Sequence, residues 1–166
     1  MFRNNRAARI IAPLVVIAIL VIVMEFVNTK KEEKKDVIIG KCSVSIDCKT
    51  ILDNRDILDL ELRDKVPKDG VILKKIEVDL HKGDTAYDIL YKVTKKNNIS
   101  MESSGTANDK YIEGIDNFYE KNCGGESGWK YSVNGKFPSK SSSICKLKNG
   151  DNVKWRYTCN LGKDLE

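Results

Sequence analysis

An apolar run near the amino terminus divides this chain into a part suited to a membrane and a part suited to water. Residues 10–27 are apolar except for Glu25, and Pro13 lies in the first turn, where its missing N–H costs little. At about 1.5 Å per residue, a helix over this run spans about 27 Å, close to one hydrocarbon core. We therefore predict a transmembrane signal anchor over 10–27, preceded by a short basic N-terminal segment, 1–9.

A cleaved signal peptide is the competing interpretation of the same run. The basic start fits it, but the run is long for such a peptide and no small-x-small cleavage signal follows, so we favour the uncleaved anchor. The basic residues on its two flanks do not decide the orientation, whereas five cysteines suit an oxidising compartment. We expect a single-pass protein of the cell membrane with its C-terminal domain on the extracytoplasmic side.

The charged residues indicate a linker and argue against one class of partner. Residues 28–36 contain no apolar side chain and are predicted to form a solvated, charged linker. Of the 29 Lys and Arg and the 24 Asp and Glu, seven and four precede residue 37, which leaves 22 and 20 and a net charge of +2 for 37–166. The sequence shows no cluster of these cations, so nucleic acid is not an expected partner.

The pattern of apolar residues in 37–166 predicts an α+β domain with one sheet wrapped around one main helix. The helix is expected over 84–97, because Asp84 or Thr85 offers an N-cap and Ala86, Ile89 and Leu90 begin a buried stripe. A shorter helix is expected over 53–63. The other elements are predicted as strands at 42–46, 71–80, 99–103, 110–115, 117–120, 129–133 and 152–158.

The five cysteines are interpreted mainly as disulfide partners. Cys42 and Cys48 are too far apart along an extended strand to pair with each other. Cys123 and Cys145 bracket the 129–133 strand and its turn, and Cys159 follows the last strand, from which it could reach Cys48. The candidate pairs are thus Cys123–Cys145 and Cys48–Cys159, with free or metal-bound thiols as the alternative. We expect no metal site, because Cys-x-x-Cys and His/Cys clusters are missing from the sequence.

The sequence lacks the usual catalytic arrangements. His81 is the single histidine, and no Ser-His-Asp or Cys-His arrangement accompanies it. The glycines at 124–128 lack the Lys-Ser/Thr ending and the following helix of a phosphate loop. We therefore expect no catalytic residue, no cofactor and no enzymatic activity.

An aromatic row surrounds the best specified turn of the chain. Trp129 and Tyr131 alternate with polar residues and precede Asn134-Gly135, the preferred pair for a type I′ turn. Trp155 and Tyr157 alternate likewise in the last predicted strand. If the two strands are neighbours, four large aromatic side chains line one face of the sheet. They either pack against the main helix or leave one end open to stack on a flat ligand or a glycan.

Four segments resemble a known family, and they occur in the family's order over about 70–160, which we take as the core of the domain. The chain is similar to the transcobalamin-like C-terminal domain, a β-grasp-like bacterial surface domain of unknown function. The segments are Val78–Leu90, Tyr111–Ile115, Ser127–Gly135 and Leu147–Tyr157.

The resemblance implies a β-grasp-like mixed sheet packed around one main helix, and it implies a ligand side. In animal cobalamin carriers the related domain closes over the corrinoid together with a larger helical domain. Transferred to this sequence, the ligand side comprises Trp129 and Tyr131, with the loops 124–128 and 136–142 as a rim that adds Ser127 and Phe137. We thus predict a membrane-anchored module for cobalamin, another corrinoid or an unknown small ligand. The alternative is a cell-surface module that binds or adheres to a surface protein.

Overall fold

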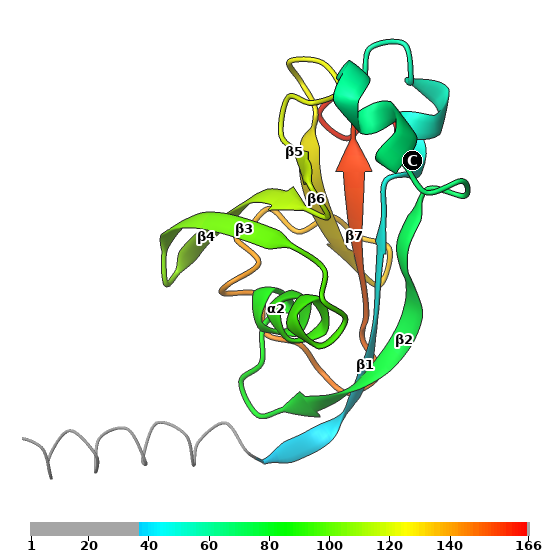
Figure 1. Ribbon diagram of the computed structural model, residues 1–166. Helices are drawn as coiled ribbons and strands as arrows, with labels where there is room; N and C mark the ends of the chain where they lie inside the picture. Colours follow the sequence, from blue (N-terminus) through cyan, green and yellow to red (C-terminus); the bar gives the residue numbers. More distant parts are fainter. Residues whose placement is uncertain (1–36, 166) are drawn as a thin grey trace, which may run out of the picture. The chain divides into compact units, whose positions relative to one another are not determined.

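The structure is a computed structural model and describes residues 37–165 (Figure 1). The predicted basic segment 1–9, anchor 10–27 and linker 28–36 lie outside the described residues. No helix within 37–165 has the length and the apolar composition that a membrane crossing requires.

Seven strands, one α-helix and two short 3-10 helices make up the described part of the chain. The α+β class and the single main helix predicted from the sequence are confirmed. In chain order the elements are β1 (Ile38–Asp47), η1 (Lys49–Asp53), η2 (Leu60–Lys65), β2 (Val71–His81), α2 (Ala86–Lys96), β3 (Met101–Thr106), β4 (Asp109–Ile115), β5 (Phe118–Tyr119), β6 (Gly128–Val133) and β7 (Asn152–Thr158).

A four-stranded mixed sheet in the order β2-β1-β7-β6 forms the larger layer. β1 pairs antiparallel with β2 and parallel with β7, and β6 pairs antiparallel with β7. Figure 1 shows β1 and β7 side by side in the middle of this sheet. Because side chains alternate along a strand, Val44, Ile46, Val153 and Trp155 all point to one face, where they are buried.

Helix α2 begins directly after one of the two N-cap residues that the sequence predicts. Thr85 is the N-cap: its Oγ1 accepts a hydrogen bond from the Asp88 N–H at 3.2 Å, and its own N–H donates to Asp88 Oδ2 at 3.1 Å. This capping box satisfies two backbone donors of the first turn. The helix buries Ala86, Ile89, Leu90, Val93 and Thr94 in the core that it shares with the larger sheet.

A second, antiparallel sheet in the order β3-β4-β5 corrects the prediction of a single sheet. Its strands pair with their neighbours in the sequence because the connections are tight turns. Gly105 has a φ of +86°, and Asp116 and Asn117 have φ values of +53° and +66°. Positive φ of this kind suits Gly and is tolerated by Asn and Asp, which allows the chain to reverse within two residues.

The short helix predicted over 53–63 is wrong. The chain instead forms η1 and η2, with a turn over 55–57 and the bridge residue Leu58 between them. Leu58 in that segment makes an isolated antiparallel bridge with Cys123, and the Asp59 N–H donates to the Asn122 carbonyl at 2.9 Å. This pairing with a distant loop replaces the local i to i+4 bonds that an α-helix would need.

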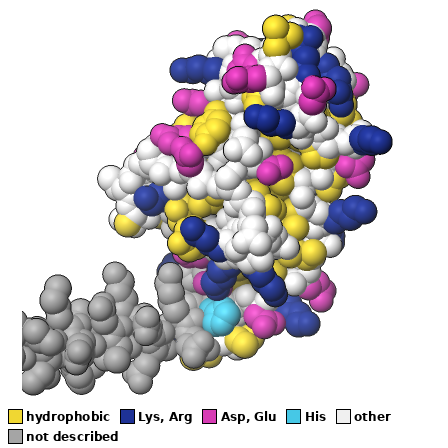
Figure 2. All heavy atoms as spheres, viewed as in Figure 1, with side chains coloured by type: hydrophobic (Ala, Val, Ile, Leu, Met, Phe, Trp, Pro, Cys, Tyr) yellow, Lys and Arg dark blue, Asp and Glu magenta, His cyan; other side chains and the backbone are white. Residues whose placement is uncertain are grey.

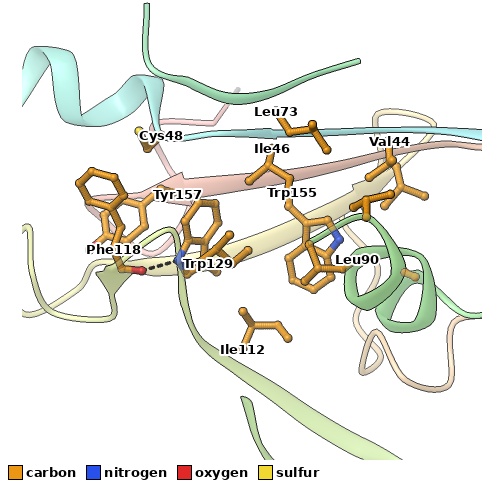
Figure 3. Packing of buried hydrophobic residues seen from close by; sticks show 14 of the residues in the cluster. Val44, Ile46, Cys48, Leu73, Leu90, Ile112, Phe118, Trp129, Trp155 and Tyr157 are labelled. Atoms are coloured by element: carbon orange, nitrogen blue, oxygen red, sulfur yellow. Dashed lines mark hydrogen bonds between the residues drawn. The ribbon is translucent and has the colours of Figure 1, made fainter. Parts of the chain in front are cut away.

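The core joins both sheets and the helix. Its largest fully buried side chains include Trp155, Tyr157 and Phe118. In Figure 3, Trp155 lies between the strands and Leu90 of α2, whereas Trp129, Tyr157 and Phe118 form a separate group further along the sheet. The aromatic residues of β6 and β7 therefore belong to the interior of the domain.

Candidate functional site

The aromatic row predicted from the sequence exists, and its register is the expected one. Trp129 of β6 lies opposite Tyr157 of β7, and Tyr131 lies opposite Trp155. The Trp129 and Tyr157 ring centroids are 5.3 Å apart at an interplanar angle of 77°, an edge-to-face contact. The Tyr131 and Trp155 rings are also 5.3 Å apart, but they stack at 29°. All four rings face the helix side of the sheet.

One end of the row is closed by internal hydrogen bonds. Trp129 is 9% exposed, and its Nε1–H donates to the Phe118 carbonyl at 2.8 Å (Figure 3). The Ser127 hydroxyl is buried as well: it accepts from the Cys123 N–H at 3.1 Å and lies 2.9 Å from the Tyr157 hydroxyl. Burial raises the pKa of Tyr157 above its usual range. Two of the four predicted ligand residues thus have their polar groups committed inside the domain.

The other end of the row reaches the surface. Tyr131 is half-buried, and its hydroxyl donates to the Lys140 carbonyl at 2.7 Å. Phe137, three residues after Asn134 in the following loop, is 44% exposed. Both Asn134 and Gly135 have positive φ, as a type I′ turn requires. The structure therefore separates the four predicted residues into two core residues and two residues at the surface.

The segment 136–147, which we call the β6–β7 loop, does not form the second arm of a hairpin. After a single bridge between Val133 and Lys136 the chain leaves the sheet edge, and β7 takes the place beside β6. Backbone hydrogen bonds hold the end of the loop to the start of α2. They run from Tyr87 N–H to Ser142 O at 3.2 Å, from Ala86 N–H to Cys145 O at 3.0 Å, and from Leu147 N–H to Asp84 O at 3.0 Å.

Two serines fix the same loop to the second sheet. The Lys110 N–H lies within hydrogen-bond distance of both Ser141 Oγ, at 3.1 Å, and Ser143 Oγ, at 3.2 Å. Ser141 Oγ in turn donates to the Lys110 carbonyl at 3.2 Å. The loop is thereby tied to two different elements while Phe137 and Ile144 on it stay exposed.

The predicted disulfides are not formed. All five cysteines are free, and all five are buried. Cys123 and Cys145 belong to different parts of the domain. The backbone of Cys123 forms a β-bridge with Leu58, between η1 and η2, whereas the Cys145 carbonyl accepts a hydrogen bond at the start of α2. The turn that was expected to bring them together directs the chain away from the sheet. Cys159 faces Cys123, with 3.1 Å between the two Sγ atoms, in place of its predicted partner Cys48.

The thiols are predicted to react slowly in the folded, reduced protein. Burial raises the pKa of Cys42 to about 11 and that of Cys48 to about 12, and the thiolate is the reactive form. A rise of two units lowers the thiolate fraction about a hundredfold at pH 8. We expect alkylation of Cys48 to be at least that much slower in the native protein than in urea, as measured by peptide mapping with a phosphine reductant present.

A Ser139→Cys variant provides the control for this experiment, because Ser139 lies exposed in the β6–β7 loop. The new thiol should react at the rate of an unfolded chain. Labelling of Cys48 as fast as that of the control thiol would contradict the buried environment seen here.

A cluster that the sequence did not reveal lies at the turn before α2. Asp84 is 1% exposed, and its Oδ2 accepts from the His81 N–H at 2.8 Å and from Lys92 Nζ at 2.6 Å. Lys92 Nζ also lies 3.1 Å from His81 Nδ1. The cluster links the end of β2 to the second turn of the helix, so we assign it a structural role. Within 37–165 no group of His, Cys, Asp and Glu could hold a metal ion.

The two tryptophans differ in whether the indole N–H is hydrogen-bonded, and the same substitution at both positions can measure the difference. Trp129 Nε1 donates to Phe118 O, whereas Trp155 Nε1 is buried without a partner among the described residues. Phe in place of Trp129 removes a satisfied donor, and Phe in place of Trp155 removes an unsatisfied one. We expect Trp129→Phe to lower the free energy of unfolding by about 1–3 kcal/mol more than Trp155→Phe does. Urea unfolding followed by circular dichroism measures both, and equal losses would contradict the assigned hydrogen bond.

One family of known proteins matches the part of the chain that contains the candidate site. Residues 83–159 match the model of a family described as "Domain of unknown function (DUF4430)". This match begins at the turn before α2 and ends at Cys159, so it contains the row, the β6–β7 loop and β7 but neither β1 nor β2. The search of curated protein sequences found no match.

Two solved structures are similar to the domain. One is a candidate metal-binding protein from Ruminococcus gnavus ATCC 29149, with 12% identity, a TM-score of 0.40, and coverage of 72% of this chain and 96% of that chain. The other is haptocorrin in complex with Cbi, with 17% identity, a TM-score of 0.46, and coverage of 73% of this chain but 26% of haptocorrin. The family match confirms the predicted resemblance to a domain of unknown function over residues 83–159. Both TM-scores lie below 0.5, so neither protein's ligand is assigned to this chain.

Proposed function

We propose that this protein is a membrane-anchored, extracytoplasmic binding module for a small ligand and has no catalytic role. The predicted ligand is cobalamin, another corrinoid, or another flat or sugar-like molecule. The observation that carries the proposal is the β6–β7 loop, which is fixed at several points yet presents apolar side chains to solvent. A preorganised loop loses little conformational entropy when a ligand binds, which favours recognition over flexibility.

The ligand would contact the open end of the aromatic row. Phe137 offers an exposed ring, and the half-buried Tyr131 ring lies beneath the same loop, where its hydroxyl is held by Lys140 O. Ser139 on the same loop is exposed and offers a hydroxyl group to a ligand. An apolar surface with a few fixed polar groups is the usual composition of a small-ligand site. Ser127 and Trp129 support this surface from the core and do not touch the ligand.

Titration of the full chain in a neutral detergent with cobinamide and with cobalamin tests the ligand. We expect saturable binding by calorimetry, and we expect Phe137→Ala to weaken it about tenfold, because an aromatic contact contributes roughly 1–1.5 kcal/mol. Leu161→Ala is the control, since Leu161 is 58% exposed and belongs to the C-terminal turn. The absence of heat and of a spectral change up to millimolar ligand would refute the corrinoid proposal and favour the surface-protein alternative.

The anchor is tested separately. If residues 10–27 span the membrane and are not cleaved, the full chain stays in the membrane pellet after extraction with alkaline carbonate. Protease added to intact cells then digests the domain from outside. Release of the intact domain by carbonate alone would refute the anchor without affecting the binding result.

A further inference from the structure

The face of the larger sheet that points away from α2 carries a groove that the proposed function does not use. It has a volume of about 430 Å³ and lies across β2, β1 and β7. We call it the basic groove and define it by its six charged residues, which are Asp47, Lys49, Lys74, Lys75, Lys154 and Arg156.

Strand register brings these charges together. The core-facing residues of β1 and β7 alternate with Ser45 and Asp47 on one strand and with Lys154 and Arg156 on the other. Parallel pairing sets Ser45 beside Lys154 and Asp47 beside Arg156. A register shift between Val44 and Ile46 against β2 adds Lys74 and Lys75 at the opposite wall. Cations more than 70 residues apart in the sequence thus line one hollow.

The cations of the groove are mostly unpaired. Arg156 Nε lies 3.7 Å from Asp47 Oδ1, and its Nη1 donates to the Leu165 carbonyl at 2.7 Å, so two contacts orient this side chain. The ammonium groups of Lys49, Lys74, Lys75 and Lys154 have no carboxylate partner among residues 37–165. Asp47 is the single acid of the lining. Like charges held this close repel one another unless an anion lies between them.

The groove also concentrates the charge of the whole domain. Five cations and one carboxylate give the lining a net charge of +4. Residues 37–166 carry 22 Lys and Arg and 20 Asp and Glu, a net charge of +2, so the rest of this part carries −2. On the face seen in Figure 2, by contrast, basic and acidic side chains are interspersed. The positive potential is therefore local, and the sequence alone did not predict such a cluster.

We propose that the basic groove binds a water-soluble anion that carries two phosphate groups. Each phosphate group carries a charge of roughly −1.5 to −2 near pH 7, so two of them balance the +4 lining, whereas one carboxylate would not. The volume exceeds the roughly 30 Å³ share of one water molecule more than tenfold, which leaves room for a diphosphate. Lysine ammonium groups bind phosphate as mobile point charges, and the oriented Arg156 adds a planar donor set.

Pyrophosphate is the probe that tests this site. Calorimetric titration of the full chain in a neutral detergent should give one saturable site, weakened as ionic strength rises, because exposed charges are screened. We expect the double variant Lys75→Gln and Lys154→Gln to bind about tenfold more weakly. The double variant Lys82→Gln and Lys148→Gln removes the same charge from exposed positions outside the groove, and it should bind within about twofold of the wild type. All four lysines are exposed, so both variants should keep the wild-type melting temperature within a few degrees.

Three results would overturn the proposal. The first is equal weakening by both double variants, which would assign the effect to net charge alone. The second is an orthophosphate affinity equal to that of pyrophosphate, since a second phosphate group would then add nothing. The third is binding only when an anionic phospholipid is mixed into the micelles, since the phosphates would then belong to a membrane. The corrinoid titration is unaffected by any of these results, because Phe137 and the groove residues are on different elements.

Discussion

Trp129→Ala is expected to lower the free energy of unfolding by about 3–5 kcal/mol. The substitution removes an indole that is almost fully buried, packs edge-to-face on Tyr157 and donates to Phe118 O. It therefore creates a cavity and leaves the Phe118 carbonyl without this donor at the same time. Urea unfolding of the full chain in a neutral detergent, followed by far-ultraviolet circular dichroism, measures the loss.

Phe137→Ala is the matched control, since Phe137 is also aromatic but is exposed. Its loss should stay within about 0.5 kcal/mol, which is usual for surface positions. The pair thus distinguishes a core residue of β6 from a proposed ligand residue of the loop that follows it. If the Trp129→Ala variant were as stable as the control, the indole would be a surface group. The assignment of Trp129 to the buried, closed end of the aromatic row would then be wrong.

Leu90→Ala is expected to cost about 2–5 kcal/mol by creating a cavity between α2 and the larger sheet. Leu90 is fully buried and lies next to Trp155 (Figure 3). Because α2 is the one α-helix among the described residues, no other helix can replace its contacts with that face of the sheet. We expect both the melting temperature and the midpoint of urea unfolding to be lower than in the wild type. The variant should still unfold in one cooperative transition.

Lys96→Ala in the last turn of the same helix is the control. Lys96 is exposed and has no ion pair within 37–165, so the substitution changes two small terms of opposite sign: Ala has the higher helix propensity, and the cation near the helix C-terminus is lost. Its stability should stay within about 0.5 kcal/mol of the wild type. A Leu90→Ala protein no less stable than this control would show that α2 is not part of the core.

The elements with strong local signals could be predicted from the sequence. The α2 cap, the Asn134-Gly135 turn and the alternation in β6 and β7 each depend on neighbouring residues. Their agreement with the structure reflects local physics: a side-chain cap, two positive φ values and a period of two. The η1–η2 region failed for the opposite reason, because its backbone pairs with Asn122 and Cys123 more than 60 residues later.

The candidate site was predictable only in part. Alternation placed Trp129 and Tyr131 on one face, but it could not show that Ser127 and Phe118 close one end of the row. The disulfide assignment failed because spacing along the chain does not report the path of the β6–β7 loop. The alternation of Lys154 and Arg156 with Val153, Trp155 and Tyr157 placed the two cations on the outer face of a strand. Their cluster, however, depends on β1 lying beside β7, and no local pattern encodes that pairing.

The parallel pairing of the first and last strands sets the order in which the domain can be built. The Ser43 hydroxyl donates to Asn152 Oδ1 at 3.0 Å, across 109 residues of chain. A nascent or translocating chain cannot complete the middle of its larger sheet until β7 has been delivered. Contacts of such long range slow folding, because loop closure precedes their gain in free energy. A chain that cannot fold before β7 has emerged stays unfolded until then, and this would suit export through a narrow channel if the domain is extracytoplasmic, as proposed above.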